Sequence, residues 1–268
     1  MKIKMAVNTV TIKPTPFVEK LSLISKAGFS GVGLWMDEIQ NYLKGSNRKP
    51  VKELLENEGL TPVEMQLIRK WQYLKGSDQK QAFREARKFF VSFRELGIAC
   101  PVVLLPSEEE GKLKDGIQDF RRMCELAGEF GITVMLEFLG WAKQIKDVRI
   151  AGEIVNEADC ANGGLLIDTF HFAKAGSTLA DLQQVPMEKV FLVHLNDVKP
   201  LPMGIKEQSR GFRFFPGEGE APLREIVRCL VEGGYKNYYC IEIFNEGYWA
   251  GDPMRILERS KRSMECLF

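Results

Sequence analysis

The stretch LLIDTFHFAKAG, residues 165–176, begins as an uninterrupted apolar run and changes character at Asp168. An apolar run of this kind is typical of a strand that is buried on both faces of a parallel sheet. His171 follows three residues later, in a chain that contains only two histidines. The stretch therefore predicts a buried strand whose end carries two chemically active side chains.

Similar apolar runs recur along the whole chain, and the stretches between them have helical spacing. Segments 82–96 and 117–130, for example, place apolar residues on one helical face. Short β-branched or apolar runs that alternate with such helices are typical of a parallel α/β fold. The eight runs are IKMAVNTV (3–10), GVGLWM (31–36), VEMQLI (63–68), CPVVLLP (100–106), ITVMLEFL (132–139), GGLLIDTF (163–170), VFLVHLND (190–197) and YYCIEIF (238–244).

Eight strand and helix units in 268 residues favour a closed (β/α)8 TIM barrel, which typically needs about 250 residues. We expect one domain that spans residues 1–268. A doubly wound open sheet is the alternative, but the first strand is followed by VNTVTIKPTP and not by a glycine-rich dinucleotide fingerprint. Glycines just before several strands, at Gly28, Gly97, Gly131 and the pair 233–234, predict helix C-caps and short connections. The segment 197–219 is the longest connection without a predicted element.

The composition excludes several functional classes. Lys plus Arg is 37 and Asp plus Glu is 36, so we expect no nucleic-acid partner, because no basic excess exists to bind phosphate backbones. The N-terminus lacks an apolar signal region and no 18-residue apolar stretch occurs, which predicts a cytoplasmic protein without a membrane segment. Six scattered cysteines without a C-x-x-C pair predict free thiols. Barrels of this kind often associate, so a homo-oligomer is an open alternative to a monomer.

Polar residues end four successive apolar runs in the second half of the chain. Because the carboxyl ends of barrel strands open on one face, these side chains are expected to converge. Three carboxylates and one imidazole are costly to bury unless a cation compensates them, which predicts one divalent metal ion. The oxygen-rich donor set suits Mn2+, Mg2+, Co2+ or Zn2+. The predicted metal ligands are Glu137, Asp168, His194 and Glu242.

Two further residues are candidate substrate contacts. His171 lies beyond Asp168, where its imidazole can reach a substrate oxygen, orient a ligand or cap the following helix. Arg213 lies close to the Pro216–Gly217 turn and can donate several hydrogen bonds to substrate oxygens, whereas Arg210 is farther from that turn.

The motifs LEFLG, LLIDTFHFAKAGS, VHLNDV, RFFPGEG and IEIFNEGYW, in this order, resemble the xylose-isomerase-like barrel family of sugar isomerases and epimerases, and within it the inosose isomerases. The match is strongest over residues 132–247. The resemblance implies that Glu137, Asp168, His194 and Glu242 bind one metal ion and that His171 and Arg213 contact substrate. It also implies that the catalytic residues Glu137 and Glu242 exchange protons with substrate on opposite sides of an enediol.

The resemblance implies a divalent-metal-dependent isomerase that acts on a small polyol ketone, such as an inosose or a similar keto-sugar. An inosose dehydratase shares the metal and the base and is an alternative. Ketose 3-epimerases of this family usually carry a second acid a few residues beyond the glutamate that ends the fifth strand. Here Glu137 is followed by FLGWAKQIK, with no acid before Asp147, so a ketose 3-epimerase is less favoured. An apurinic endonuclease-like hydrolase is disfavoured, because such enzymes hold several metal ions with many histidines and this chain has two. A non-catalytic sugar-binding barrel is a further alternative, which would need no metal.

Overall fold

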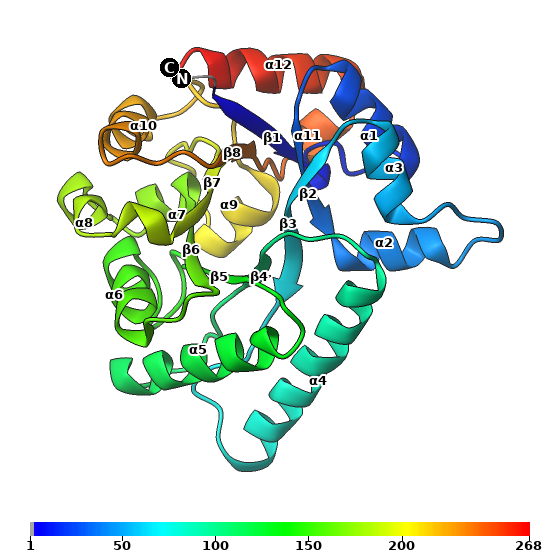
Figure 1. Ribbon diagram of the computed structural model, residues 1–268. Helices are drawn as coiled ribbons and strands as arrows, with labels where there is room; N and C mark the ends of the chain where they lie inside the picture. Colours follow the sequence, from blue (N-terminus) through cyan, green and yellow to red (C-terminus); the bar gives the residue numbers. More distant parts are fainter. Residues whose placement is uncertain (1–2) are drawn as a thin grey trace.

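Eight parallel strands close into a barrel, surrounded by helices (Figure 1). A computed structural model describes residues 3–268, and within them β1 pairs with both β2 and β8, which closes the sheet. The predicted single-domain barrel is confirmed, and each of the eight apolar runs coincides with one strand, although β3 begins two residues before its run. The strands are β1 (Lys4–Asn8), β2 (Gly31–Trp35), β3 (Thr61–Ile68), β4 (Val102–Leu104), β5 (Val134–Glu137), β6 (Gly163–Asp168), β7 (Val190–Leu195) and β8 (Tyr238–Ile241).

The helices that follow the strands form the outer ring, and the start of β1 lies beside the last helix, α12 (Figure 1). The stretches with helical spacing at 82–96 and 117–130 fall largely within α4 and α5. The α-helices are α1 (Phe17–Lys26), α2 (Met36–Leu43), α3 (Val51–Asn57), α4 (Gly76–Glu95), α5 (Leu113–Gly128), α6 (Val148–Ala158), α7 (Thr169–Lys174), α8 (Leu179–Gln183), α9 (Ile205–Gly211), α10 (Leu223–Glu232), α11 (Glu246–Trp249) and α12 (Pro253–Glu265), and the 3-10 helices are η1 (Thr9–Ile12) and η2 (Met187–Lys189).

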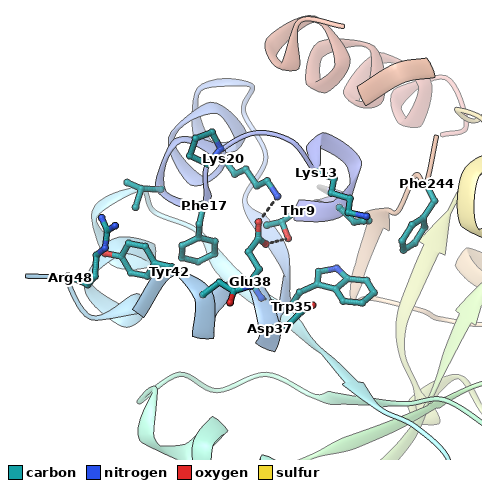
Figure 2. Close-up of a pocket in the computed structure, with 14 residues that line it drawn as sticks. Thr9, Lys13, Phe17, Lys20, Trp35, Asp37, Glu38, Tyr42, Arg48 and Phe244 are labelled. Carbon is teal, nitrogen blue, oxygen red and sulfur yellow. Dashed lines mark hydrogen bonds and ion pairs between the residues drawn. The ribbon is translucent and has the colours of Figure 1, made fainter. Parts of the chain in front are cut away.

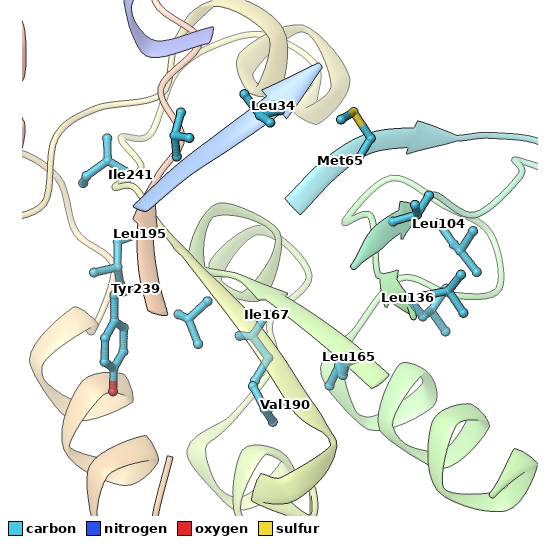
Figure 3. Packing of buried hydrophobic residues seen from close by; sticks show 14 of the residues in the cluster. Leu34, Met65, Leu104, Leu136, Leu165, Ile167, Val190, Leu195, Tyr239 and Ile241 are labelled. Carbon is cyan, nitrogen blue, oxygen red and sulfur yellow. The ribbon is translucent and has the colours of Figure 1, made fainter. Parts of the chain in front are cut away.

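The strands bury both of their faces, as their apolar runs predicted. Side chains on the outer face, among them Leu34, Leu136 and Ile167, pack with the helices in the main core (Figure 3). Side chains on the inner face form a smaller apolar cluster inside the barrel. Its buried members are Ala6, Val63, Val103, Met135, Leu166, Leu192 and Cys240.

The long connection after β7 contains a helix that the sequence did not predict. In α9, the buried side chains are those of Gln208 and Ser209, and Gly204 precedes it without a side-chain cap. The helix therefore lacks both the apolar stripe and the capping residue by which a helix is recognised in sequence. The predicted glycine C-caps are confirmed at Gly28, Gly97 and Gly131, and in the pair 233–234 it is Gly234 that has the left-handed φ, at +91°.

Two compositional predictions bear on residues 3–268 as a whole. All six cysteines are free thiols, as expected from their spacing. None of the helices in this part of the chain combines the length and the apolar character needed to cross a bilayer.

Candidate active site

The four residues that the sequence predicts as metal ligands come together at one end of the barrel. Glu137 and Asp168 are the last residues of β5 and β6, His194 lies one residue before the end of β7, and Glu242 directly follows β8. One donor atom from each lies within 4.8 Å of those of the other three, and all four side chains are buried. The structure thus assembles the predicted cluster, whose role in metal binding stays a prediction.

Strand alternation explains why these four side chains point into the barrel. The residues two positions earlier on the same strands belong to the interior apolar cluster, so the polar side chains lie on the same face, one layer nearer the mouth. Asp168 and His194 are also direct partners in the β6–β7 register. The cluster is therefore a polar layer above an apolar one, and water is excluded beneath it.

The electrostatics of the cluster show a surplus of negative charge. Burial, together with the charges of Asp168 and Glu242, raises the pKa of Glu137 well above its ordinary value. Burial opposes the charge on Glu242 too, but His194 and Arg213 hold the pKa of that carboxyl below its ordinary value. Burial lowers the pKa of His194, whereas the carboxylates of Glu64 and Glu242 raise it. The net effect is a pKa well above the usual value for histidine.

The donor set fits a divalent cation. The Nδ1 atom of His194 is buried and has no hydrogen-bond partner within residues 3–268, although it lies 3.3 Å from Glu242 Oε2 and 3.6 Å from Asp168 Oδ2. A buried nitrogen of this kind, facing carboxylate oxygens, is what a metal ligand requires. Three carboxylates and one imidazole suit the borderline and hard ions named from the sequence.

His171 lies in the first turn of α7, three residues beyond Asp168. Asp168 caps α7 by accepting a hydrogen bond from His171 N at 3.0 Å. The imidazole Nδ1 lies 3.3 Å from Gly140 N, which donates to it, and Nε2 lies 3.4 Å from Arg213 Nη2 and 3.9 Å from Glu137 Oε1. Burial lowers the pKa of His171 to about 4, which keeps the ring neutral at pH 7.

Arg213 is buried within the cluster, whereas Arg210 is exposed. Its Nη1 donates to Asp168 Oδ2 at 2.7 Å and to Glu242 Oε2 at 2.8 Å. Nη2 donates to Ser209 Oγ at 2.9 Å, which fixes the plane of the guanidinium. Arg213 also lines a cavity that opens onto the cluster, so its guanidinium faces both the carboxylates and the space for a bound molecule.

Asp197 is a buried residue that the sequence analysis missed. Its carboxylate accepts hydrogen bonds from four backbone N–H groups, those of Val198, Gly217, Gly219 and Ala221, at 2.8–3.0 Å. Asp197 thereby holds the turn that follows Arg213. The acid at the end of VFLVHLND was the available signal, since it ends the apolar run two residues beyond β7.

A second missed group lies on β1 and β3. Glu64 is fully buried, and His194 Nε2 lies 3.0 Å from each of its oxygens. Asn8 Nδ2 and Gln66 Nε2 donate to Glu64 at 2.7 Å and 2.9 Å. Glu64 and Gln66 alternate with apolar residues in VEMQLI, which was the sequence signal for polar side chains inside the barrel.

A cavity of about 910 Å3, which we call the main cavity, opens onto the cluster. Of the four predicted ligands, the two glutamates Glu137 and Glu242 line it, together with His171 and Arg213. Arg69 and Arg210 stand nearer its mouth, where burial and the charge of Arg210 lower the pKa of Arg69. Within residues 3–268 neither of these two guanidinium groups has an ion-pair partner.

A smaller cavity of about 590 Å3 adjoins the mouth and shares Lys13, Trp35 and Phe244 with the main one (Figure 2). At its base, Lys20 Nζ donates to Glu38 Oε1, and Thr9 Oγ1 donates to Glu38 Oε2 at 2.7 Å (Figure 2). The side chain of Lys20 is 2% exposed and that of Glu38 is 21% exposed. The polar groups at the base of this cavity are therefore already satisfied by one another.

A closed parallel barrel whose strands end in a buried cluster of carboxylates and an imidazole is the architecture of a TIM-barrel enzyme. Comparison with known families identifies this barrel further. The model of the xylose isomerase-like TIM barrel family matches residues 21–267, and the chain belongs to that family.

Individual relatives of the chain are enzymes. A 3-dehydroshikimate dehydratase of Pseudomonas aeruginosa is 31% identical over 249 residues, which are 91% of this chain and 38% of the dehydratase. The chain therefore spans about two fifths of that relative's length. An inosose isomerase of Halalkalibacterium halodurans is 26% identical over 246 residues, 89% of this chain and 86% of the isomerase. Both relatives cover nearly the whole barrel.

Among solved structures, a crystal structure described as the IOLI protein with a bound zinc atom superimposes with a TM-score of 0.89. It shares 23% sequence identity, and the match covers 99% of this chain and 98% of the other. At this identity the likeness establishes the fold.

Proposed function

We propose that this protein is a divalent-metal-dependent isomerase that moves a carbonyl and hydroxyl pair on a small cyclic polyol ketone, such as an inosose, through an enediol. The observation that carries the proposal is the placement of Glu137 and Glu242 in one buried cluster with Asp168 and His194 and on the wall of one cavity. Two such carboxyls provide a proton acceptor and a proton donor in one site.

Each residue of the cluster has a part in the proposed reaction. Glu137, Asp168, His194 and Glu242 hold the ion, which supplies Lewis-acid chemistry when bound. Glu242, which lines the cavity, accepts the proton from the hydroxyl-bearing carbon beside the ketone. The same glutamate, or Glu137, then delivers a proton to the former carbonyl carbon, and the proton of the hydroxyl group passes to the former carbonyl oxygen. The His171 imidazole and the Arg213 guanidinium stabilise the two oxygens of the enediolate.

Dehydration of a carboxylate-bearing cyclic ketone is the second candidate, and the arginines at the mouth favour it. Arg69 and Arg210 line the cavity without an ion-pair partner in the described part of the chain, and two such guanidinium groups match a carboxylate. 3-Dehydroshikimate is a cyclic polyhydroxy ketone with a carboxylate, and relatives at 31% and 27% identity carry the name of its dehydratase. The same base begins both reactions, and they differ in whether a hydroxyl group leaves after enolisation.

The test is NMR and mass spectrometry of the Mn2+-loaded protein in D2O with inososes, ketohexoses and 3-dehydroshikimate, with the metal removed before measurement. Isomerisation of an inosose with solvent deuterium beside the carbonyl supports the isomerase, whereas a product lighter by one water identifies the dehydratase. Inversion at one carbon of a ketohexose identifies an epimerase. If the protein binds Mn2+ but neither converts nor exchanges any of these ketones, the proposed substrate class is wrong.

Arg69→Gln separates the two candidates further. If a carboxylate is bound, the KM for 3-dehydroshikimate rises roughly 10- to 100-fold, as expected for a lost charge-assisted hydrogen bond. The KM for a neutral inosose should change little in the same variant. Arg87→Gln, which removes an exposed arginine far from the mouth that pairs with Glu129, is the matched control.

A further inference from the structure

His194 is fixed from the side that faces away from the proposed metal. Its Nε2 lies 3.0 Å from both Oε1 and Oε2 of Glu64. A carboxylate only accepts hydrogen bonds, so Nε2 must carry the hydrogen and donate it to Glu64. In the neutral ring, Nδ1 is then left with its lone pair, and Nδ1 is the nitrogen that faces Asp168 and Glu242.

Glu64 is itself held in place by two amides. Asn8 Nδ2 donates to Oε1 at 2.7 Å, and Gln66 Nε2 donates to Oε2 at 2.9 Å. The orientation of the Asn8 amide is set by its own oxygen, which accepts from Val10 N at 3.0 Å and from Trp35 Nε1 at 2.7 Å. Each carboxylate oxygen therefore has a donor besides His194, and rotation of the Glu64 carboxylate would break these bonds.

The neighbouring strand leaves room for this carboxylate. Gly33 pairs with Glu64 in the β2–β3 register, directly after a register shift between Val32 and Gly33. A Cβ atom at position 33 would lie 2.2 Å from Glu64 Oε1 and 2.8 Å from Asn8 Nδ2. Any side chain larger than a hydrogen atom at position 33 would thus displace the carboxylate.

From these contacts we propose that Glu64 is a positioning residue that fixes the tautomer and the ring orientation of His194, so that Nδ1 is presented to the metal. The inference rests on the proposed metal site and deepens it. Glu64 does not line the main cavity, so it has no direct contact with a substrate there. Carboxylates that orient a ligating histidine in this way typically contribute 10- to 100-fold to metal affinity.

The structure also offers a competing role for Glu64. Glu64, His194 and Cys240 bring one donor atom each within 4.8 Å of one another, so Glu64 could instead belong to a second metal site. The hydrogen bond from Nε2 accounts for the contact between Glu64 and His194 without a second ion. Binding of a second equivalent of metal is therefore the alternative that the experiment must separate.

The experiment measures Mn2+ affinity and stoichiometry of the whole chain by competition with a chromophoric chelator, which needs no substrate. We expect one Mn2+ per wild-type chain and a 10- to 100-fold weaker affinity in Glu64→Gln. Gly33→Ala displaces the carboxylate but keeps its charge, and the same direction of change is expected. Glu38→Gln is the matched control, because this glutamate lies outside the cluster, and its Mn2+ affinity should equal that of the wild type.

The histidine tautomer is read independently from 15N NMR of the Zn2+-loaded wild-type protein. The chain has two histidines, and His171→Gln assigns their signals. The inference requires a protonated Nε2 and a metal-bound Nδ1 in His194, which can be observed even if both Glu64→Gln and Gly33→Ala fail to fold. Metal on Nε2, two bound ions that fall to one in Glu64→Gln, or wild-type affinity in Glu64→Gln would each overturn it. A wild type that binds no metal would instead overturn the metal site on which the proposed function depends.

Discussion

Arg213 Nη1 lies 2.7 Å from Asp168 Oδ2, in the middle of the side chains that are predicted to hold a cation. Both residues are almost completely buried, so the ion pair is not screened by water. Asp168 in turn caps the helix that carries His171. The pair therefore links the predicted metal cluster to both candidate substrate contacts, and Arg213 supplies part of the positive charge that the carboxylates need.

Arg213→Gln should destabilise the metal-free protein. Removal of one partner of a buried ion pair leaves an uncompensated charge and typically costs about 3–5 kcal/mol of unfolding free energy. Urea denaturation at pH 8 with a chelator measures this loss. Because a divalent ion compensates the same carboxylates, saturating Mn2+ should restore a larger share of stability to the variant than to the wild type. Equal gains in both proteins would show that Arg213 does not serve as a countercharge.

Asp168→Asn and His194→Ala should each abolish metal binding and turnover. Each change removes one of the four predicted donors from the buried cluster, so the remaining three should hold the ion far more weakly. Metal analysis of the purified variants against wild type tests this directly. Asp181→Asn, at the exposed cap of α8, is the control for the aspartate change. A variant that keeps its metal and near wild-type activity would show that the ligand set is misassigned.

The fold was predictable from sequence because each strand is apolar on both faces and most helices bury an apolar stripe. The helix α9 was not predicted, because its buried residues, Gln208 and Ser209, are polar and give no periodic pattern of apolar residues. It was also predictable that four side chains come together, because strand ends converge in a barrel wherever they lie in the chain; these are Glu137, Asp168, His194 and Glu242. Glu64 was not predicted, because it lies within a strand and not at its end; the alternation in VEMQLI indicates only that the side chain points inward, and its role depends on its contact with His194.

The stability of the metal-free protein should fall at acid pH in part because of His171. Its pKa is lowered from 6.5 to about 4 in the folded state. Between pH 6.5 and about pH 4, His171 is protonated in the unfolded chain but neutral in the folded protein, so the free energy of unfolding decreases as the pH falls. His171 should account for about 2 kcal/mol of the loss between pH 7.5 and pH 5.

His171→Gln isolates this contribution, because the carboxylates titrate in both proteins. Denaturant unfolding with a chelator should give a smaller drop between pH 7.5 and pH 5 in the variant than in the wild type. The variant should still bind Mn2+, since His171 is not a predicted ligand. Parallel pH profiles would mean that the ring is not held neutral, and loss of Mn2+ binding would contradict its role as a substrate contact.

The ion pair between Lys20 and Glu38 at the base of the smaller cavity should respond asymmetrically to mutation (Figure 2). Glu38→Gln leaves the buried ammonium of Lys20 without a countercharge, and we expect a loss of roughly 2–3 kcal/mol, below that of a fully buried pair because Glu38 is 21% exposed. Lys20→Met should cost less, since Glu38 keeps its bond from Thr9 and its access to water. The double variant should recover part of the loss of Glu38→Gln, because neither charge is then buried. Urea denaturation of the four proteins completes the cycle, and an additive result would show that the two side chains do not stabilise each other.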